Sequence, residues 1–303
     1  MTRSFPQLAR TGRTSWWRHV LAVLVILGSW LVLGGLVAAV LPLLDGDPVT
    51  TADPRTWGRG SAMLAYLVLN VPFVFLLAGL IVAVRGIHRR SVRSLVTPAS
   101  RIAWRRVGLG AVLYVALLAV TGAVLWALDP GDIRVSFEPG RFLLFLPVVL
   151  VLTSVQAGSE ELLFRGYVIQ TAGLRIRQPL VLASISGLLF LAAHLGNREL
   201  GSGFLLLSAY YFGFGLLMAL VTLRDDNAEL AIGAHVGNNL YGALVIGFSE
   251  STLQTPTILR TTGEFRPGAS LLVFLVVGTA FYLVTSRWGR VRTPATVGAG
   301  SGR

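Results

Sequence analysis

The sequence contains no cysteine and no lysine, and it has few charged residues of any kind. Without cysteine the chain has no disulfide, no thiolate nucleophile and no cysteine-ligated zinc site. Only 13% of its 303 residues are charged, whereas an ordinary soluble domain has about 25%. Because 54% of the residues are hydrophobic, this composition predicts a polytopic membrane protein.

Hydrophobic runs of membrane-spanning length recur along the whole chain. A transmembrane helix needs about 20 mostly apolar residues, and lipid cannot satisfy the open backbone groups of an exposed strand or loop. The sequence therefore predicts an all-α fold with about eight transmembrane helices. The expected spans are Val20–Leu44, Ala62–Val84, Val107–Leu128, Phe142–Gly158 with a polar extension, Leu180–Leu195, Phe204–Leu223, Ala228–Phe248 and Ala269–Ser286.

All 26 basic residues are arginine, and their positions predict the orientation of the chain. Four arginines precede the first span and seven lie between Arg85 and Arg106, whereas the alternate loops are acidic or neutral. Cytoplasmic loops carry an excess of basic residues, so both termini are expected in the cytoplasm. The loop from Arg224 to Glu229 departs from this pattern with a net negative charge. Because topology explains the net charge of +12, we expect no nucleic-acid partner.

Two adjacent glutamates interrupt the hydrophobic pattern after the fourth expected span. On a helix Glu161 and Arg165 are four residues apart, in the order that favours an ion pair. Glu160 is rotated by about 100° from Glu161, so it can face a different neighbour. One carboxylate can thus be held ionised while the other serves as a general base. The alternative is a structural Glu/Arg cluster at the end of a helix.

Two further motifs place histidines inside apolar runs. Phe190 and His194 share a helix face, so the aromatic ring can pack against the imidazole and fix its orientation. His235 and Asn239 also share a face, and together they could donate hydrogen bonds to a developing oxyanion. The alternative for each motif is a structural role, because His and Asn commonly bond neighbouring helices in membranes.

The depths expected for the two histidines do not agree. Counted from the cytoplasmic loops, His235 lies about 10 Å into its helix and His194 about 22 Å. Straight, upright helices would keep these side chains apart. A shared site therefore requires a tilted, broken or re-entrant helix, or different helix boundaries.

In this order the three motifs resemble the CAAX protease and bacteriocin-processing family, also called CPBP or Abi, of intramembrane endopeptidases. The family pattern is E-E-x-x-x-R, then F-x-x-x-H, then H-x-x-x-N, and the chain matches all three without departure. The resemblance covers roughly residues 140–248, which we expect to form the catalytic region. Residues 1–130 would hold the first three spans and the Arg-rich loop. Residues 249–303 would hold the last helix and a disordered Arg/Gly-rich tail.

The resemblance implies endoproteolysis within or beside the bilayer. Glu160 and His194 would activate a water, and His235 and Asn239 would stabilise the oxyanion. Glu161, Arg165 and Phe190 would support and orient the site. The family has also been described as metalloproteases, and Glu160, Glu161, His194 and His235 could ligate Zn²⁺. Because the sequence lacks H-E-x-x-H and a Glu/His pair can activate water unaided, we favour a site without metal or cofactor.

The substrate implied by the resemblance is a membrane-associated peptide or protein. Type II CAAX prenyl proteases of this family remove a tripeptide from the C-terminus of a prenylated protein, and bacterial relatives act in peptide maturation or bacteriocin immunity. The expected location is a bacterial plasma (inner) membrane. Two alternatives remain open at this point. Buried ionisable residues also mark the pathways of transporters and channels. A relative that has lost activity could serve as a scaffold or immunity protein.

Overall fold

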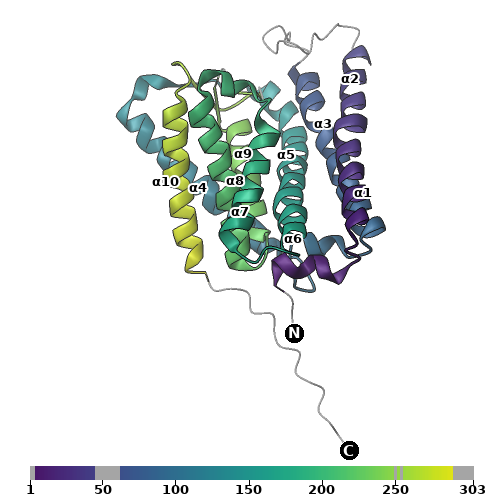
Figure 1. Cartoon of the computed structure of the whole chain (residues 1–303). Coiled ribbons are helices and arrows are strands. Elements are labelled where there is room, and N and C mark those ends of the chain that lie inside the picture. The colour runs from purple at the N-terminus through teal and green to yellow at the C-terminus, as the bar shows by residue number, and fades with distance from the viewer. Residues whose placement is uncertain (1–3, 45–61, 249–250, 253–254, 289–303) are drawn as a thin grey trace, which may run out of the picture.

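The structure is a computed structural model that describes residues 4–44, 62–248, 251–252 and 255–288. Helices make up most of this part of the chain, as the sequence predicts (Figure 1). The predicted disordered tail after residue 288 lies outside the described residues, and so does the acidic loop that contains Asp45, Asp47 and Asp53.

In the described part of the chain, ten α-helices alternate with π-helical, 3₁₀ and strand segments. The α-helices are α1 (Trp16–Leu27), α2 (Gly34–Leu44), α3 (Ala62–Ile81), α4 (Trp104–Leu128), α5 (Pro139–Glu161), α6 (Ile169–Ala172), α7 (Pro179–His194), α8 (Phe204–Asp225), α9 (Glu229–Leu244) and α10 (Pro267–Ser286). Three π-helical segments continue α1, α3 and α5, namely Gly28–Leu33, Val82–Ile87 and Leu162–Val168. Four 3₁₀ segments are described, at Phe5–Thr11, Val92–Leu95, Pro130–Asp132 and Arg198–Ser202. The strands β1 (Ile133–Val135), β2 (Ile246–Gly247) and β3 (Leu259–Thr261) form a small sheet in the order β1-β3-β2.

Six helical stretches within the described residues are long and apolar enough to cross a membrane. They are Trp16–Leu41, Ala62–Ile87, Trp104–Leu128, Pro139–Ala172, Phe204–Asp225 and Pro267–Ser286. The other two expected spans correspond to α7 and α9, which have 16 residues each and would be about 24 Å long. The chain is therefore an all-α polytopic membrane protein. The total of eight spans and the cytoplasmic termini remain predictions.

The helices lie side by side in one bundle, with α5 near its middle (Figure 1). On one side of α5, α3 packs against it and α2 packs against α3. On the other side α9 contacts α5, α4 and α8, while α7 and α10 both pack on α8. The three helices that carry the sequence motifs, α5, α7 and α9, thus belong to one connected group.

Glycines allow α9 to lie directly on the backbone of α4. A Cβ atom at Gly233 would stand 2.0 Å from the carbonyl oxygen of Val107, and one at Gly237 would stand 2.8 Å from that of Ala111. Small residues permit such close approach between membrane helices, where van der Waals packing is the main attraction. This packing fixes the position of His235, which lies on α9 between the two glycines.

The acidic loop that departs from the arginine pattern is neutralised by its neighbours. Arg106 at the start of α4 lies 2.6 Å from Asp225 and 3.4 Å from Glu229. Arg224 lies 3.1 Å from Asp225 as well. The two carboxylates are almost fully buried, so the loop shows no free negative charge at these positions. The net negative charge of this loop is therefore balanced by ion pairs with Arg106 and Arg224.

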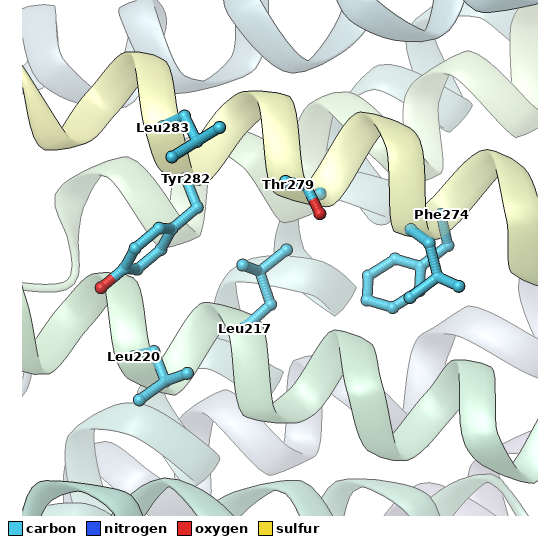
Figure 2. A pocket seen from close by; sticks show the side chains of 8 residues that line it. Leu217, Leu220, Phe274, Thr279, Tyr282 and Leu283 are labelled. Atoms are coloured by element: carbon cyan, nitrogen blue, oxygen red, sulfur yellow. The ribbon is translucent and has the colours of Figure 1, made fainter.

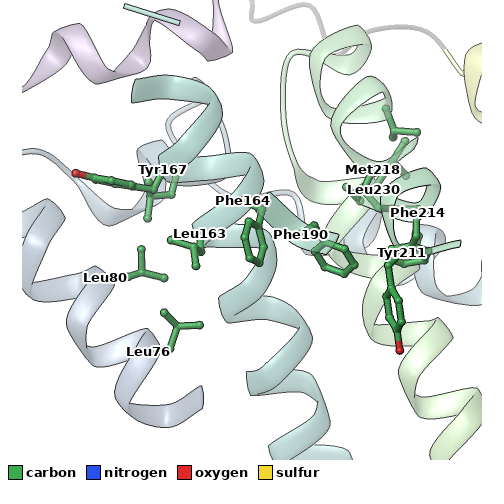
Figure 3. Packing of buried hydrophobic residues seen from close by; sticks show 14 of the residues in the cluster. Leu76, Leu80, Leu163, Phe164, Tyr167, Phe190, Tyr211, Phe214, Met218 and Leu230 are labelled. Carbon is green, nitrogen blue, oxygen red and sulfur yellow. The ribbon is translucent and has the colours of Figure 1, made fainter. Parts of the chain in front are cut away.

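Buried aromatic and aliphatic side chains fill the space between α3, the end of α5, α7 and α8 (Figure 3). Phe164 and Phe190 lie edge to face with their ring centroids 5.4 Å apart. Phe190 is followed by Phe214 at 5.8 Å. This row of rings runs from the segment after the glutamate pair to α8. The polar residues of the three motifs therefore have apolar side chains beside them.

A separate apolar groove runs between α8 and α10 (Figure 2). Leucine and aromatic side chains line it, with Thr279 as its polar member. None of the residues that the sequence singles out lies in this groove. The candidate functional site must therefore be sought inside the bundle, where α5, α7 and α9 meet.

Candidate active site

The glutamate pair forms the last two residues of α5, and the π-helical segment begins immediately afterwards. Both glutamates are buried, as are the five consecutive residues from Leu163 to Tyr167. Charged residues are costly in a membrane interior and are usually paired or functional there. The pair is thus held inside the bundle, which argues against the interpretation as a surface cap of a helix.

Glu161 has one neighbour in an ion pair and another in a hydrogen bond. Its Oε2 lies 3.2 Å from Nε of Arg165, and both side chains are completely buried. Its Oε1 lies 2.8 Å from Nδ1 of His235 on α9. The first contact is the ion pair that the spacing predicts. The second joins two motifs 74 residues apart and has no counterpart in the local pattern.

Glu160 faces the other nitrogen of the same imidazole. Its Oε2 lies 3.5 Å from Nε2 of His235, which is longer than an ordinary hydrogen bond. Within the described residues this oxygen accepts no hydrogen bond. His235 therefore lies between the two carboxylates, with one of them firmly bound and the other close but not engaged.

His194 is the last residue of α7, and its ring folds back along its own helix. Nδ1 lies 2.7 Å from the carbonyl oxygen of Phe190, one turn earlier. Because a carbonyl oxygen can only accept, Nδ1 must carry the proton. Nε2 of a neutral His194 is then unprotonated and available as a base. The ring centroids of Phe190 and His194 are 4.2 Å apart, so the predicted packing of this pair is confirmed.

Phe190 connects the three motifs. Its ring lies 4.2 Å from that of His194, 5.7 Å from that of His235, and 4.8 Å from the guanidinium carbon of Arg165. Side chains on a helix lean toward its N-terminus, so the His194 ring returns to the level of Phe190. Both histidine rings therefore lie beside the same Phe190 ring, although α7 is continuous from Pro179 to His194.

Asn239 lies one turn beyond His235 on α9. It is half-buried, and its side-chain oxygen accepts a hydrogen bond of 3.0 Å from Asn238. With its oxygen engaged in this way, its amide nitrogen remains a potential donor. The structure thus brings Glu160, Glu161, Arg165 and His235 into direct contact, links His194 to them through Phe190, and leaves Asn239 joined through α9.

Sequence reasoning missed two residues beside His194. Tyr211 of α8 stacks on its imidazole at 4.4 Å, and Glu199 accepts a hydrogen bond of 2.5 Å from the Tyr211 hydroxyl. Tyr211 lies within an apolar run and gives no periodic signal. Glu199 could have been noticed, because it is a carboxylate only five residues after His194.

The set of four residues considered as zinc ligands is not arranged as a metal site. Oε1 of Glu161 is hydrogen-bonded to His235, and its Oε2 faces the cationic guanidinium of Arg165 at 3.2 Å. Among the residues that the structure describes, no group of three or more His, Asp and Glu side chains could hold a metal ion. These residues in their present conformation do not fit a zinc ion.

Comparison with known proteins gives two matches. The family model described as "Type II CAAX prenyl endopeptidase Rce1-like" matches residues 142–241. This range includes all seven residues of the three motifs, Glu160, Glu161, Arg165, Phe190, His194, His235 and Asn239. The uncharacterized protein YyaK of Bacillus subtilis (strain 168) is 30% identical over 238 residues, which cover 78% of this chain and 79% of YyaK. No solved structure matches the chain.

Proposed function

Because this chain belongs to the Rce1-like family of type II CAAX prenyl endopeptidases, we propose that it hydrolyses a peptide bond of a membrane-associated substrate. The family implies a protease-type enzyme with a peptide or protein substrate in a membrane. The observation that carries the assignment to particular residues is the buried contact of His235 with both Glu160 and Glu161. Two carboxylates, an imidazole and Arg165 gathered inside an apolar bundle are expensive to bury unless they work together.

The contacts of His235 restrict where its protons lie. Oε2 of Glu161 faces Arg165 and its Oε1 faces Nδ1 of His235 at 2.8 Å, so we take Nδ1 as the donor in this contact. Nε2 of His235 and Oε2 of Glu160 are 3.5 Å apart, so a second proton could be on either of these two atoms. In the working state we place this proton on Nε2. Glu160 is then an ionised base, and the imidazolium of His235 is a donor.

The reaction follows from these protonation states. Glu160, assisted by the unprotonated Nε2 of His194, removes a proton from a water, and the water oxygen bonds to the scissile carbonyl carbon. The negative charge that develops on the carbonyl oxygen is stabilised by Nε2–H of His235 and the side-chain amide of Asn239. The proton taken from water passes to the leaving nitrogen, and the C–N bond breaks. One carboxylic acid and one amine are released.

This mechanism uses only groups of the protein and a water. The contacts of Glu161 support it, because its Oε1 is already hydrogen-bonded to His235 and its Oε2 faces the positive charge of Arg165. We expect proteolysis by the purified protein to survive a strong chelator. Loss of activity with the chelator and its recovery with Zn²⁺, but not with Mg²⁺, would reject this part of the proposal.

The substrate that we propose is a peptide precursor or the C-terminus of a membrane-anchored protein, in a bacterial plasma membrane. A prenylated C-terminus is the version of this substrate that the family name suggests. The burial of the site supports a substrate that enters the bilayer rather than one that remains in water.

The Glu160→Gln variant tests the assignment of the base. It keeps the size of the side chain and removes its basicity, so the cleavage rate should fall by roughly 10²–10⁴-fold. The measurement is quantitative proteomics of peptide termini in membranes that contain the wild-type chain or the variant. Glu138→Gln is the matched control, because Glu138 is exposed and pairs only with Arg141.

Two results would contradict the proposal. Termini that are identical in wild-type and Glu160→Gln membranes would remove Glu160 from the reaction. A variant that leaves termini unchanged but abolishes ion or solute flux in reconstituted vesicles would favour a transporter instead.

A further inference from the structure

His194 lies at the end of a helix, where the backbone is held less firmly than in the helix interior. It is the final residue of α7, and the last turn of a helix lacks the hydrogen bonds that hold its interior. A base must nevertheless be kept in one orientation, because small misplacements of reacting groups are costly in rate. Its bond to the Phe190 carbonyl fixes one ring nitrogen. Something else must hold the plane of the ring.

The second face of the imidazole is covered from another helix. Tyr211 of α8 stacks on it with the ring centroids 4.4 Å apart and the planes 28° from parallel. Phe190 covers the first face at 4.2 Å and 34°. His194 therefore lies between two aromatic rings, one from its own helix and one from its neighbour, and it can turn only if one of them moves.

Tyr211 is itself held at its hydroxyl group. The hydroxyl donates a hydrogen bond of 2.5 Å to Oε1 of Glu199 and accepts one of 2.8 Å from the amide of Asn197. Hydrogen bonds with a charged partner are stronger than those between neutral groups. Rotation of the Tyr211 ring away from His194 would break both of these bonds.

Glu199 is anchored in turn by a third segment. Its Oε2 accepts a hydrogen bond of 3.2 Å from the backbone nitrogen of Thr252 and another from the Thr252 hydroxyl. The backbone nitrogen of Arg198 donates to the Thr252 hydroxyl at 3.2 Å. The turn after α7, the helix α8 and the segment at Thr252 are thereby tied together around one carboxylate.

We propose that Tyr211 is a positioning residue for His194 and that Glu199 holds Tyr211 in place. This inference rests on the proposed function for its consequence in catalysis, but the arrangement itself can be measured without a substrate. Tyr211 does not touch the scissile bond. It restricts the His194 ring to the orientation in which Nδ1 binds the Phe190 carbonyl and Nε2 carries no proton.

Three variants separate the stacking from the hydrogen bonds. Tyr211→Leu removes both, Tyr211→Phe keeps the ring without its hydroxyl, and Glu199→Gln keeps the hydroxyl but weakens its anchor. Tyr282→Phe is the matched control, since Tyr282 lies beside the groove between α8 and α10. For the peptide that loses cleavage in the Glu160→Gln variant, kcat should fall by roughly tenfold or more in Tyr211→Leu. The fall should be smaller in Tyr211→Phe and Glu199→Gln, with KM unchanged in all three.

Nitrogen-15 NMR of the imidazoles in bilayers gives the second readout. The chain has four histidines, and a His194→Asn variant identifies the signals of His194. The wild-type protein should show one neutral form of His194, with the proton on Nδ1. Tyr211→Leu should show an exchanging mixture of both tautomers, while Tyr282→Phe should match the wild type.

The outcomes distinguish this inference from the proposed function. A single unchanged tautomer and full kcat in folded Tyr211→Leu would overturn the positioning role. Lost activity with an unchanged His194 spectrum would overturn it too, because Tyr211 would then act only on the fold. If the wild type cleaves no peptide but the tautomer responds to Tyr211→Leu, the proposed function fails and the positioning role stands.

Discussion

Arg165 is the largest completely buried side chain in the described part of the chain, and its guanidinium has no contact with solvent. Its guanidinium is compensated by Glu161 at 3.2 Å and by the face of the Phe190 ring at 4.8 Å. A cation in a protein interior is tolerated only when it is paired in this way. At the scale of single residues, the site thus depends on charges that stabilise one another.

Removal of one partner should cost far more stability than removal of both. We expect Arg165→Met to lower the free energy of unfolding by about 3–5 kcal/mol, because Glu161 is left as an uncompensated buried charge. The double variant Glu161→Gln with Arg165→Met should recover part of this loss. Arg141→Met, which removes an exposed pair with Glu138, should cost at most about 1 kcal/mol. Unfolding in mixed detergent micelles measures all three, and equal losses for Arg165→Met and Arg141→Met would contradict the argument.

The residues of the site were predictable only where their partners are local. The Glu161–Arg165 and Phe190–His194 contacts join residues four apart, and helix geometry alone predicts them. The contact between Glu161 and His235 spans 74 residues, and no periodic pattern encodes it. The stacking of Tyr211 on His194 was missed for the same reason, since it depends on how α7 and α8 pack.

At the scale of helices, close packing decides where the residues of the candidate site lie. The backbone of α9 contacts that of α4 at Gly233. On α8, a Cβ atom added at Gly215 would lie 2.8 Å from the Cα of Gly187 on α7. Membrane helices gain little from the hydrophobic effect between them, so such contacts carry much of the association. A small shift of α9 would move His235 relative to the glutamates of α5.

Gly233→Ala should therefore impair cleavage although the residue touches no substrate. The added Cβ would meet the Val107 carbonyl oxygen at 2.0 Å, so α9 must move away from α4. A displacement of about 1 Å can cost on the order of 10²-fold in rate. Gly242→Ala is the control on the same helix, because a Cβ there meets nothing within 4 Å. Cleavage assays in reconstituted vesicles should separate the two variants, and equal rates would show that the α4–α9 contact does not position the site.

At the scale of the whole molecule, composition and hydropathy predicted the class of fold, and six of the expected spans correspond to long apolar helices. The remaining two, α7 and α9, have 16 residues each and bear His194 at the end and His235 in the interior, respectively. The negative loop after α8 could not be understood from sequence, because its partner Arg106 lies 119 residues away.

The predicted topology, with both termini in the cytoplasm, can be tested in a chain that has no cysteine of its own. Ser100→Cys places a single thiol in the Arg-rich loop, and Ser202→Cys places one after α7; both serines are exposed. By the positive-inside rule, a membrane-impermeant maleimide should label Ser202→Cys in intact cells but label Ser100→Cys only after permeabilisation. The reverse pattern would invert the topology, and labelling of both in intact cells would refute the assignment of these loops to opposite sides.

The segment Phe5–Thr11 forms hydrogen bonds with residues that come more than 160 positions later in the sequence. Phe5 donates its backbone N–H to Asp226, Gln7 donates to the Gly173 carbonyl and Arg10 to that of Leu174. During synthesis this segment leaves the ribosome before any of these partners exists. It can reach its final place only after α8 has been inserted, so its docking is one of the last steps of assembly. A bulky fusion placed at this end should accordingly delay the completion of the bundle rather than the insertion of its first helices.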